Sequence, residues 1–355
     1  MQNDQLYQSN NFNFIRVVAA IMVIITHTYV LVGLGVQYDF LYRISNGELM
    51  ISIIGLRAFF IISGFLIAQS MERSPDYKTY FIKRVMRIFP GLIVCIFSII
   101  LIWGVIFTNT LCSDYLSRPS TWLYLKNISL YKIVLEIPTV FEGNVSQVIN
   151  GSIWTLAYEF SYYLMVIGLC MIGIFQRKWL AFIMFIIFFG LNLYTIYGVV
   201  PAKLFYFLIY TDLQLDHFTD FGLFFIGGML LYLYRNTILY KHSITIGLLG
   251  LYIISIVLHI PWTLKYIAIP YIIMYLAFVP KVDVITNWGK KTDYSYGIYI
   301  YGMPVQQAVI ALIGVSIHPD LISFIAIVIV IPFAWVSWNV IEKRALALTH
   351  RHKDA

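Results

Sequence analysis

The sequence predicts an all-α fold, a polytopic membrane helical bundle that crosses the bilayer about ten times. Of its 355 residues, 60% are hydrophobic and only 12% are charged, whereas about 25% of the residues of an average soluble domain are charged. The mean hydropathy is +0.81, and no stretch has the composition of a separate soluble domain. We therefore expect a single transmembrane domain over residues 1–355, without an appended soluble domain.

Ten apolar stretches have about the length that a transmembrane helix needs, roughly 20 residues. The N-terminus has neither the basic region nor the cleavage site of a signal peptide, and its apolar run is longer than a signal-peptide core, so we expect the first span to be retained. An even number of spans places both termini on one side. The expected spans lie near residues 12–34, 51–71, 89–108, 153–175, 179–197, 217–234, 243–260, 263–280, 295–316 and 321–341.

Lysine and arginine residues divide unequally between the two faces that these spans define. The face that includes both termini carries 16 of them and the opposite face six, so the positive-inside rule makes the termini cytoplasmic. The placement of the basic residues between the spans favours membrane lipid as a partner, with no nucleic acid. The longest connection, residues 109–150, is then extracytoplasmic and polar enough to meet a hydrophilic substrate. The 16 residues are Arg73, Lys78, Lys83, Arg84, Arg87, Arg177, Lys178, Arg235, Lys241, Lys281, Lys290, Lys291, Lys343, Arg344, Arg351 and Lys353, and the six are Arg43, Arg118, Lys126, Lys132, Lys203 and Lys265.

Cysteine and acidic residues predict neither a disulfide framework nor a metal site. Cys95 and Cys170 lie inside apolar segments and Cys112 in a connection, a scattered and odd set. Four clustered side chains look at first like metal ligands, but acidic residues at a helix N-terminus are already favoured by its dipole, so we expect no metal. These four are Asp212, Asp216, His217 and Asp220.

Arg16 and His27 stand about three helical turns apart on one face of the first span. An ionisable residue inside a span is costly, so the aligned pair indicates a polar interior. At 1.5 Å per residue His27 lies beyond mid-membrane toward the outer side, and Arg16 lies near the cytoplasmic surface. A neutral imidazole there can act as general base on a hydroxyl. The alternative is a histidine that bonds a neighbouring helix and an arginine that snorkels.

Arg57, in the second span, requires a carboxylate, backbone carbonyls or an anionic ligand. Glu159, at the entry of the fourth span, lies close to the same outer level and offers one partner. The pair predicts either a structural link between two helices or part of a site, and the two roles are compatible. Ser63-Gly64 and Gly227-Gly228 permit close approach of helices, and we expect them to serve packing.

Arg84 and Arg87 share one helical face beside the bilayer in the segment YFIKRVMRIFP. Two guanidinium groups can clamp a phosphate, which suits a nucleotide-like donor in the cytosol. Anchoring under the positive-inside rule explains such a cluster about as well. The two explanations stay open at this stage.

Taken together, these segments resemble the acyltransferase 3 family of integral membrane acyltransferases, whose polysaccharide O-acetyltransferases modify surface glycans. The resemblance covers nearly the whole chain. Gly302 stands where many relatives have histidine and Arg344 replaces a frequent proline, so a second histidine in the late helix is absent here. The matching segments are Arg16 with His27 (R-x10-H), GLRAFFIISGFLIAQS, Arg84 to Arg87 (R-x-x-R), NGSIWTLAYEF, SYGIYIYGMP and SWNVIEK.

The resemblance implies O-acetylation of a cell-surface polysaccharide or its lipid-linked precursor in a bacterial inner membrane, with acetyl-CoA as the donor. It implies that Arg16, Arg84 and Arg87 hold the donor. His27 would be the general base or carry a transient acyl group, with Glu159 and Arg57 orienting it or the acceptor. Aromatic belts enrich tryptophan and tyrosine at membrane interfaces regardless of substrate, so among the aromatic residues near the outer face only Trp154, inside a matched segment, is assigned to the acceptor. The residues assigned to substrate binding are Ser152, Trp154 and Tyr299.

A transporter or flippase of a glycan or small solute is the alternative function, since ten spans with buried charges also suit transport. No convincing inverted repeat is present, and the R-x-x-R with an intramembrane His27 is better explained by a coenzyme A donor. A polysaccharide polymerase would usually have a long outer loop rich in arginine or histidine. Residues 109–150 contain one arginine and no histidine.

Overall fold

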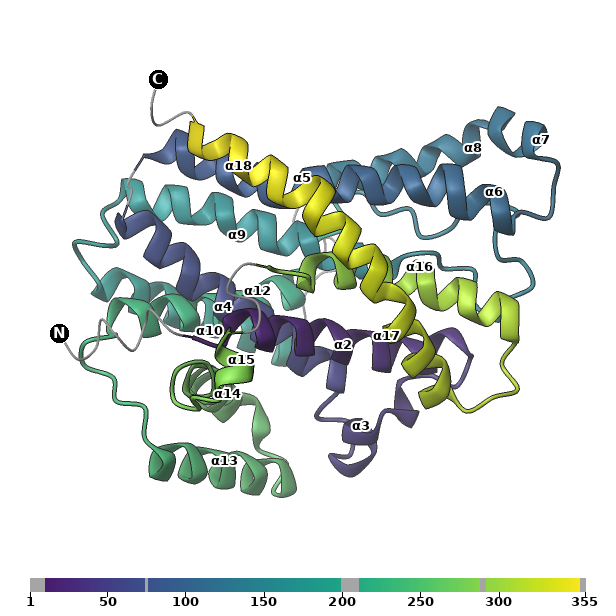
Figure 1. Ribbon diagram of the computed structural model, residues 1–355. Coiled ribbons are helices and arrows are strands. Elements are labelled where there is room, and N and C mark those ends of the chain that lie inside the picture. Colours follow the sequence, from purple (N-terminus) through teal and green to yellow (C-terminus); the bar gives the residue numbers. More distant parts are fainter. Residues whose placement is uncertain (1–9, 74–75, 199–210, 288–291, 352–355) are drawn as a thin grey trace. The chain divides into compact units, whose positions relative to one another are not determined.

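The computed structural model describes residues 10–73, 76–198, 211–287 and 292–351, and within these ranges the protein is helical (Figure 1). Its described part has no strand, only an isolated antiparallel bridge between Thr108 and Val140. The predicted all-α class is confirmed. Four basic residues of the charge count, Lys203, Lys290, Lys291 and Lys353, lie outside the described residues.

Each of the ten expected spans coincides with a helix, and seven of these helices are long and apolar enough to cross a membrane. A multi-pass membrane protein is therefore confirmed, while the count of ten crossings and the cytoplasmic termini stay predictions. The seven are α2 (Phe12–Leu31), α4 (Ile51–Arg73), α5 (Tyr77–Ser98) with η2 (Ile99–Trp103) and α6 (Gly104–Phe107), η4 (Gly151–Ile153) with α9 (Trp154–Met171), α10 (Trp179–Tyr197), α16 (Ser295–Ile313), and α17 (Pro319–Val336) with η5 (Ser337–Glu342) and α18 (Lys343–Arg351).

The remaining helices are shorter or more polar. α12 (Leu215–Leu233), α13 (His242–Val257) and α14 (Pro261–Phe278) occupy the other three expected spans. The short helices of the connections are η1 (Val36–Tyr38), α3 (Phe40–Ile44), α7 (Cys112–Ser117), α8 (Pro119–Trp122), η3 (Leu123–Ser129) and α15 (Asp283–Asn287).

Two helices extend beyond the boundaries that hydropathy predicts. α5 begins at Tyr77 rather than near residue 89, because Asp76 caps it by accepting hydrogen bonds from the amides of Lys78 (3.3 Å) and Thr79 (3.0 Å). The R-x-x-R segment is therefore helical. Likewise, the chain after the last span continues as α18, an amphipathic helix.

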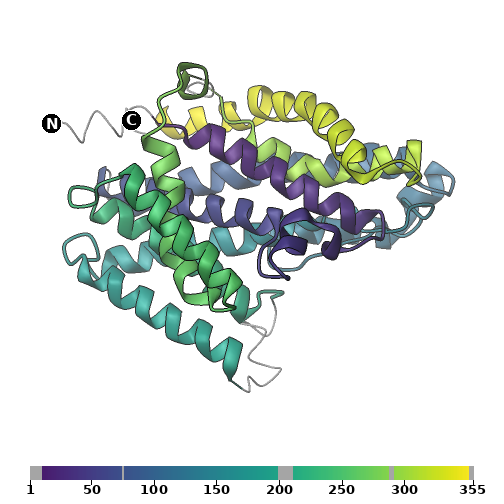
Figure 2. The same cartoon turned by 90° about the horizontal axis from the view of Figure 1, so that it is seen from below.

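The chain forms two compact units, and we describe each by itself. The first comprises residues 1–16, 54–81 and 158–292, and the second residues 17–53, 82–157 and 293–355. In the first unit α10 packs on α12, α12 on α14, and α13 on α14 (Figure 2).

Close approach of α4 and α12 in the first unit confirms the packing role predicted for two glycines. A Cβ atom on Gly64 would lie 1.9 Å from the carbonyl oxygen of Phe225, and one on Gly228 would lie 2.0 Å from that of Ile61. Neither position has room for a side chain, so glycine lets the two backbones touch.

α16 is the central helix of the second unit. Every residue from Ser295 to Ile310 is buried, and α17 packs along it as the next helix in the chain (Figure 1). A Cβ atom on Gly297 would lie 2.7 Å from the Cα atom of Ala334, so these two helices approach closely as well. The buried polar side chains of α16 therefore have to find partners inside the unit.

Candidate active site

His27 lies in the last two turns of α2, the end that the predicted topology places on the outer side, and is half-buried. The Oγ atom of Ser152 lies 3.4 Å from its Nδ1 atom. Within the described part of the chain, the Nε2 atom has no hydrogen-bond partner. Because a hydroxyl can donate or accept, Ser152 is compatible with either tautomer of the neutral ring. The arrangement fixes one nitrogen and leaves the other for a further molecule.

Three hydrogen bonds hold the backbone around Ser152. The Oδ1 atom of Asn150 accepts from the Ser152 amide (3.2 Å), which caps the short helix η4. The Nδ2 atom of Asn150 donates to the carbonyl of Ile300 in α16 (2.7 Å), and the amide of Gly151 lies 2.9 Å from the Sδ atom of Met303. The predicted NGSIW segment is thus bound to α16 at the point where it presents its serine to His27.

Tyr299 of α16 supports the same segment from the other side. Its hydroxyl donates to the carbonyl of Ser152 (2.8 Å) and forms a short hydrogen bond with the hydroxyl of Thr155. Tyr299 is buried. Three segments that are far apart in the sequence therefore meet around His27, namely α2, the entry of α9 and α16.

The structure also explains the departure at Gly302. A Cβ atom there would lie 2.9 Å from the side chain of Ile24, so the space of a larger side chain is filled by α2 one turn before His27. Gln306, one turn further along α16, donates to the Ile24 carbonyl (2.8 Å) and to the Thr28 hydroxyl (2.5 Å). These contacts fix the rotation of α2 about its axis on both sides of His27.

Glu159 and Arg57 both lie in the first unit, and the structure corrects their predicted pairing. Glu159 accepts hydrogen bonds from the hydroxyls of Ser63 (3.0 Å) and Tyr163, without an ion pair to Arg57. The pair was predicted only because both residues were expected at the same depth in the membrane. Hydroxyl groups from α4 and from the next turn of α9 bind the Glu159 carboxylate instead.

Asp220 of α12 is the carboxylate that pairs with Arg57, at 3.5 Å. It also binds the ammonium group of Lys265 (2.7 Å) and accepts a hydrogen bond from Tyr266 (2.6 Å). The Nε and Nη1 atoms of Arg57 are buried and have no partner in the described part of the chain. The guanidinium therefore keeps donor capacity for an anion or a carbonyl group.

Arg87 of the R-x-x-R segment is bound by carboxylates from two other predicted segments, all in the second unit. Its guanidinium lies 2.5 Å from Asp293, just before α16, and 3.5 Å from Glu342 of the SWNVIEK segment. Hydroxyls of Ser295 (2.5 Å) and Ser337 (2.7 Å) donate to these carboxylates. A buried charge network links the three segments, and donor binding by Arg87 has to compete with it.

The remaining predicted residues occupy separate places. Arg16 lies over the ring of Phe59, with 5.8 Å between the guanidinium carbon and the ring centroid, and Arg84 is half-buried on α5. Trp154 is the first residue of α9 and is half-buried. The described residues contain no group of three or more histidine, cysteine, aspartate and glutamate side chains that suits a metal ion.

Comparison with known proteins decides the family. An acyltransferase domain model matches residues 9–339. The chain belongs to the acyltransferase 3 family. It is 28% identical over 352 residues to an O-acetyl transferase of Shigella phage Sf6, covering 96% of this chain and 97% of the relative. It is 32% identical over 160 residues to nodulation protein 10 of Rhizobium leguminosarum bv. viciae, covering 44% of this chain and 42% of that protein. No solved structure shows a significant match.

The predicted enzyme class is therefore correct, and the protein is a membrane acyltransferase. For such an enzyme, a histidine held at Nδ1 with Nε2 available has the chemistry of a general base or a nucleophile toward an acyl group.

Sequence reasoning missed polar residues in each of the two compact units of the acyltransferase. Asp220 was grouped with acidic residues at a helix start and Lys265 was counted with the basic residues of the outer face, and the structure shows that they form a half-buried ion pair. Gln306 and Gln307 could have been identified from the sequence, because two adjacent side-chain amides in an apolar helix require hydrogen-bond partners on neighbouring segments. Both are completely buried.

Proposed function

We propose that this membrane acyltransferase transfers an acetyl group from acetyl-CoA in the cytosol to a hydroxyl of a cell-surface polysaccharide or its lipid-linked precursor. We further propose a bacterial inner membrane as its location. The observation that carries this proposal is the contact between Ser152 and His27. It orients an otherwise unoccupied imidazole nitrogen in a family of acyltransferases, and a relative over nearly the whole chain is an O-acetyl transferase.

In the proposed reaction, Nε2 of His27 takes the proton of the acceptor hydroxyl as its oxygen attacks the thioester carbonyl. The new ester C–O bond forms, the C–S bond breaks, and the sulfur leaves with the proton that His27 returns. An acyl-histidine intermediate is the alternative route, with His27 attacking first. Both routes require the nitrogen that Ser152 leaves available.

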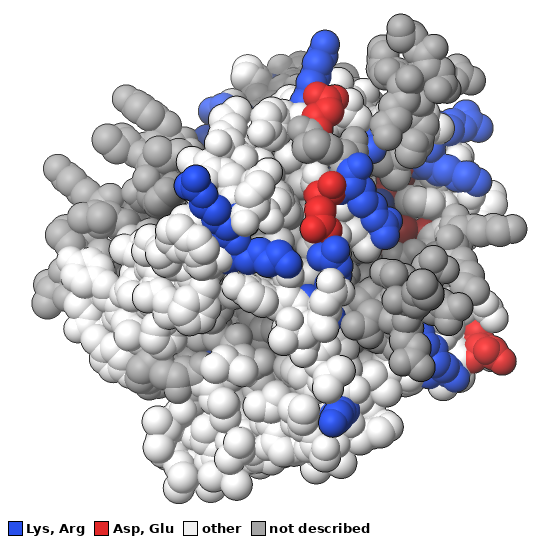
Figure 3. Space-filling model, turned by 90° about the vertical axis from the view of Figure 1, so that its left-hand side faces the viewer, with Lys and Arg blue, Asp and Glu red and all other residues white. Residues whose placement is uncertain are grey.

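Cationic side chains are proposed to bind the donor. Arg84 and Arg87 would hold phosphate groups of the coenzyme, and Arg16 would stabilise charge near the entrance. Figure 3 shows a face on which lysine and arginine side chains outnumber aspartate and glutamate, which supports a cytoplasmic side by the positive-inside rule. Arg87 is paired with Asp293 and Glu342, so its binding of a phosphate would compete with these carboxylates.

The other predicted residues are proposed to act around the transferred group. Arg57 would use its two buried unpartnered donor atoms to bind a carbonyl oxygen or an anion, and Glu159 would support it or the acceptor. Ser152 would line the acceptor site, and Tyr299 would support it by holding the Ser152 carbonyl. Trp154 would stack on the sugar ring.

Radiolabelled acetyl-CoA supplied to inverted membrane vesicles tests the proposed function, with vesicles from cells that lack the protein as the control. The proposal predicts label in polysaccharide or its lipid-linked precursor only when the protein is present. Movement of glycan or solute across the vesicle membrane without any labelling would favour the transporter or flippase instead.

A further inference from the structure

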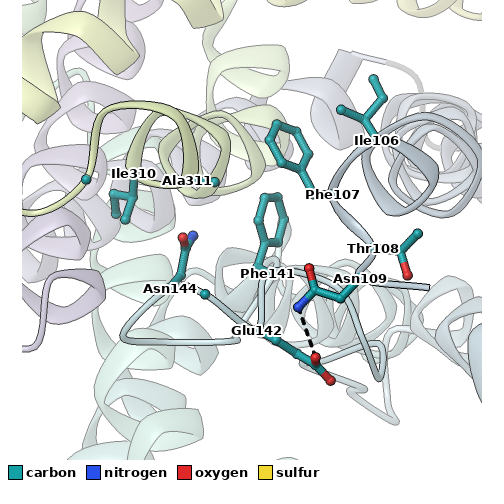
Figure 4. Close-up of a pocket in the computed structure, with 11 residues that line it drawn as sticks. Ile106, Phe107, Thr108, Asn109, Phe141, Glu142, Asn144, Ile310 and Ala311 are labelled. Atoms are coloured by element: carbon teal, nitrogen blue, oxygen red, sulfur yellow. Dashed lines mark hydrogen bonds between the residues drawn. The ribbon is translucent and has the colours of Figure 1, made fainter.

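A pocket of about 360 Å³ lies in the second unit, away from His27. The turn after α6, the loop over residues 141–144 and the end of α16 surround it (Figure 4). In the predicted topology all three belong to the outer side. The lining residues that matter for the argument are Phe107, Asn109, Phe141, Glu142, Asn144 and Ile310.

Aromatic and polar groups are combined in this pocket in the way that suits a sugar. The rings of Phe107 and Phe141 stack with centroids 4.8 Å apart (Figure 4). Beside them, the Nδ2 atom of Asn109 donates to the Oε2 atom of Glu142 (3.0 Å). Apolar walls with a few convergent polar groups are typical of small-molecule sites. A carboxylate and amides offer acceptors and donors to several hydroxyls.

The backbone of the pocket is fixed before any ligand binds. Thr108 and Val140 form an antiparallel bridge, the Asn109 amide donates to the Thr139 carbonyl (2.9 Å), and the Phe141 amide to the Phe107 carbonyl (3.2 Å). Thr139 and Phe141 have φ angles of 75° and 58°. Non-glycine residues rarely adopt these values, and such conformations, which persist when surrounding contacts impose them, cluster at binding sites.

A continuous segment leads from this pocket to His27 along α16. The side chain of Asn144 donates to the backbone carbonyl of Gln307 (3.0 Å). The side-chain amide of Gln307 donates to the backbone carbonyls of Ser146 (2.8 Å) and Val148 (2.6 Å). The segment then binds Ile300 through Asn150 and reaches Ser152. From Gln307 to Ile300 the helix rises about 10 Å, a distance suited to an oligosaccharide rather than to one sugar.

We propose that this pocket binds a sugar ring of the acceptor at a distance from the hydroxyl that is acetylated. The acceptor chain would follow residues 144–152 toward Ser152 and His27. This inference rests on the proposed function and assigns it an acceptor subsite. Glu142 and Asn109 would bind ring hydroxyls, while the half-buried ring of Phe107, backed by the buried ring of Phe141, would contact the apolar face of the sugar. The carboxylate and amides favour a polyhydroxylated ligand over an acyl chain.

The test uses the full-length protein in lipid nanodiscs and compares Glu142→Ala and Asn109→Ala with Glu136→Ala. Glu136 is an exposed glutamate in the same connection, outside the pocket. The probes are the de-O-acetylated surface polysaccharide of the source strain and its lipid-linked precursor. Glu142→Ala and Asn109→Ala each remove hydrogen bonds to the sugar, directly or through the Glu142 carboxylate. We expect the KM for the acceptor to rise about tenfold in both variants. Their kcat and donor KM, and all constants of Glu136→Ala, stay at the wild-type level.

Direct binding of both probes to His27→Ala separates this inference from the proposed function. The inference is supported if His27→Ala still binds the probe and the double variant His27→Ala/Glu142→Ala does not. This holds even if no variant transfers acetyl groups. Binding of one probe alone identifies which form of the acceptor occupies it. Equal binding in both variants, an unchanged acceptor KM in Glu142→Ala, or displacement of the probe by phospholipid headgroups would overturn the inference.

Discussion

The hydroxyl of Ser152 lies 3.4 Å from Nδ1 of His27 and joins the entry of α9 to α2 within one compact unit. The serine reaches this position because Asn150 caps η4 and Tyr299 binds the Ser152 carbonyl. We infer that the serine positions the imidazole. Its effect on turnover is therefore separable from that of the histidine itself.

Replacing Ser152 by alanine is expected to lower kcat about two- to tenfold, since a hydrogen bond to a neutral group contributes about 0.5–1.5 kcal/mol. Ser152→Thr, which keeps the hydroxyl, should recover part of the loss. Steady-state transfer kinetics at matched protein levels would measure both. An unchanged kcat in Ser152→Ala together with a raised acceptor KM would instead make Ser152 a substrate ligand.

Arg87→Ala is expected to destabilise the protein, because it leaves the buried carboxylates of Asp293 and Glu342 without their cation. Breaking a buried ion pair typically costs about 3–5 kcal/mol. Arg84→Ala should raise the KM for acetyl-CoA, because Arg84 is proposed to bind a phosphate of the coenzyme. Thermal unfolding in detergent and donor kinetics on both variants distinguish these roles. If Arg87→Ala unfolded like the wild type and only the donor KM rose, the structural role of Arg87 would be wrong.

Asp220→Asn is expected to lower thermal stability, since it removes the carboxylate that Arg57 and Lys265 share. The buried Arg57 and the half-buried Lys265 are left without their anion, and breaking a buried pair costs about 3–5 kcal/mol. Asp283→Asn, at an exposed position of the same unit, is the matched control. Comparable unfolding temperatures for the two variants would show that the ion pair is dispensable.

Hydropathy predicted the helices well because a transmembrane helix is specified by its own apolar length, independently of its neighbours. α5 begins before its apolar span for a local reason, since Asp76 caps a helix whose first turns are amphipathic and therefore fail a hydropathy criterion. For the same reason the described chain continues as α18 where the sequence predicted only a tail.

Contacts between helices that are distant in the chain could not be predicted from the sequence. Arg57 and Glu159 lie at the same expected level, but depth does not determine which helices are neighbours, and Asp220 on α12 is the actual partner of Arg57. The matched segments were found in order along the chain. Their convergence at Arg87 and around Ser152 depends on the packing of α16, and the pocket at Phe141 depends on backbone angles that no motif indicated.

Transfer of radiolabelled acetyl groups by His27→Ala is the most direct measurement of the central claim, with His318→Ala as the matched control. His318 is exposed, with 72% of its side-chain surface accessible, and lies at the start of α17. Loss of a general base typically lowers the rate about 10²- to 10⁴-fold. At equal membrane insertion, a loss of this size in His27→Ala alone is the predicted result. Wild-type transfer by His27→Ala would contradict the assignment of the active site.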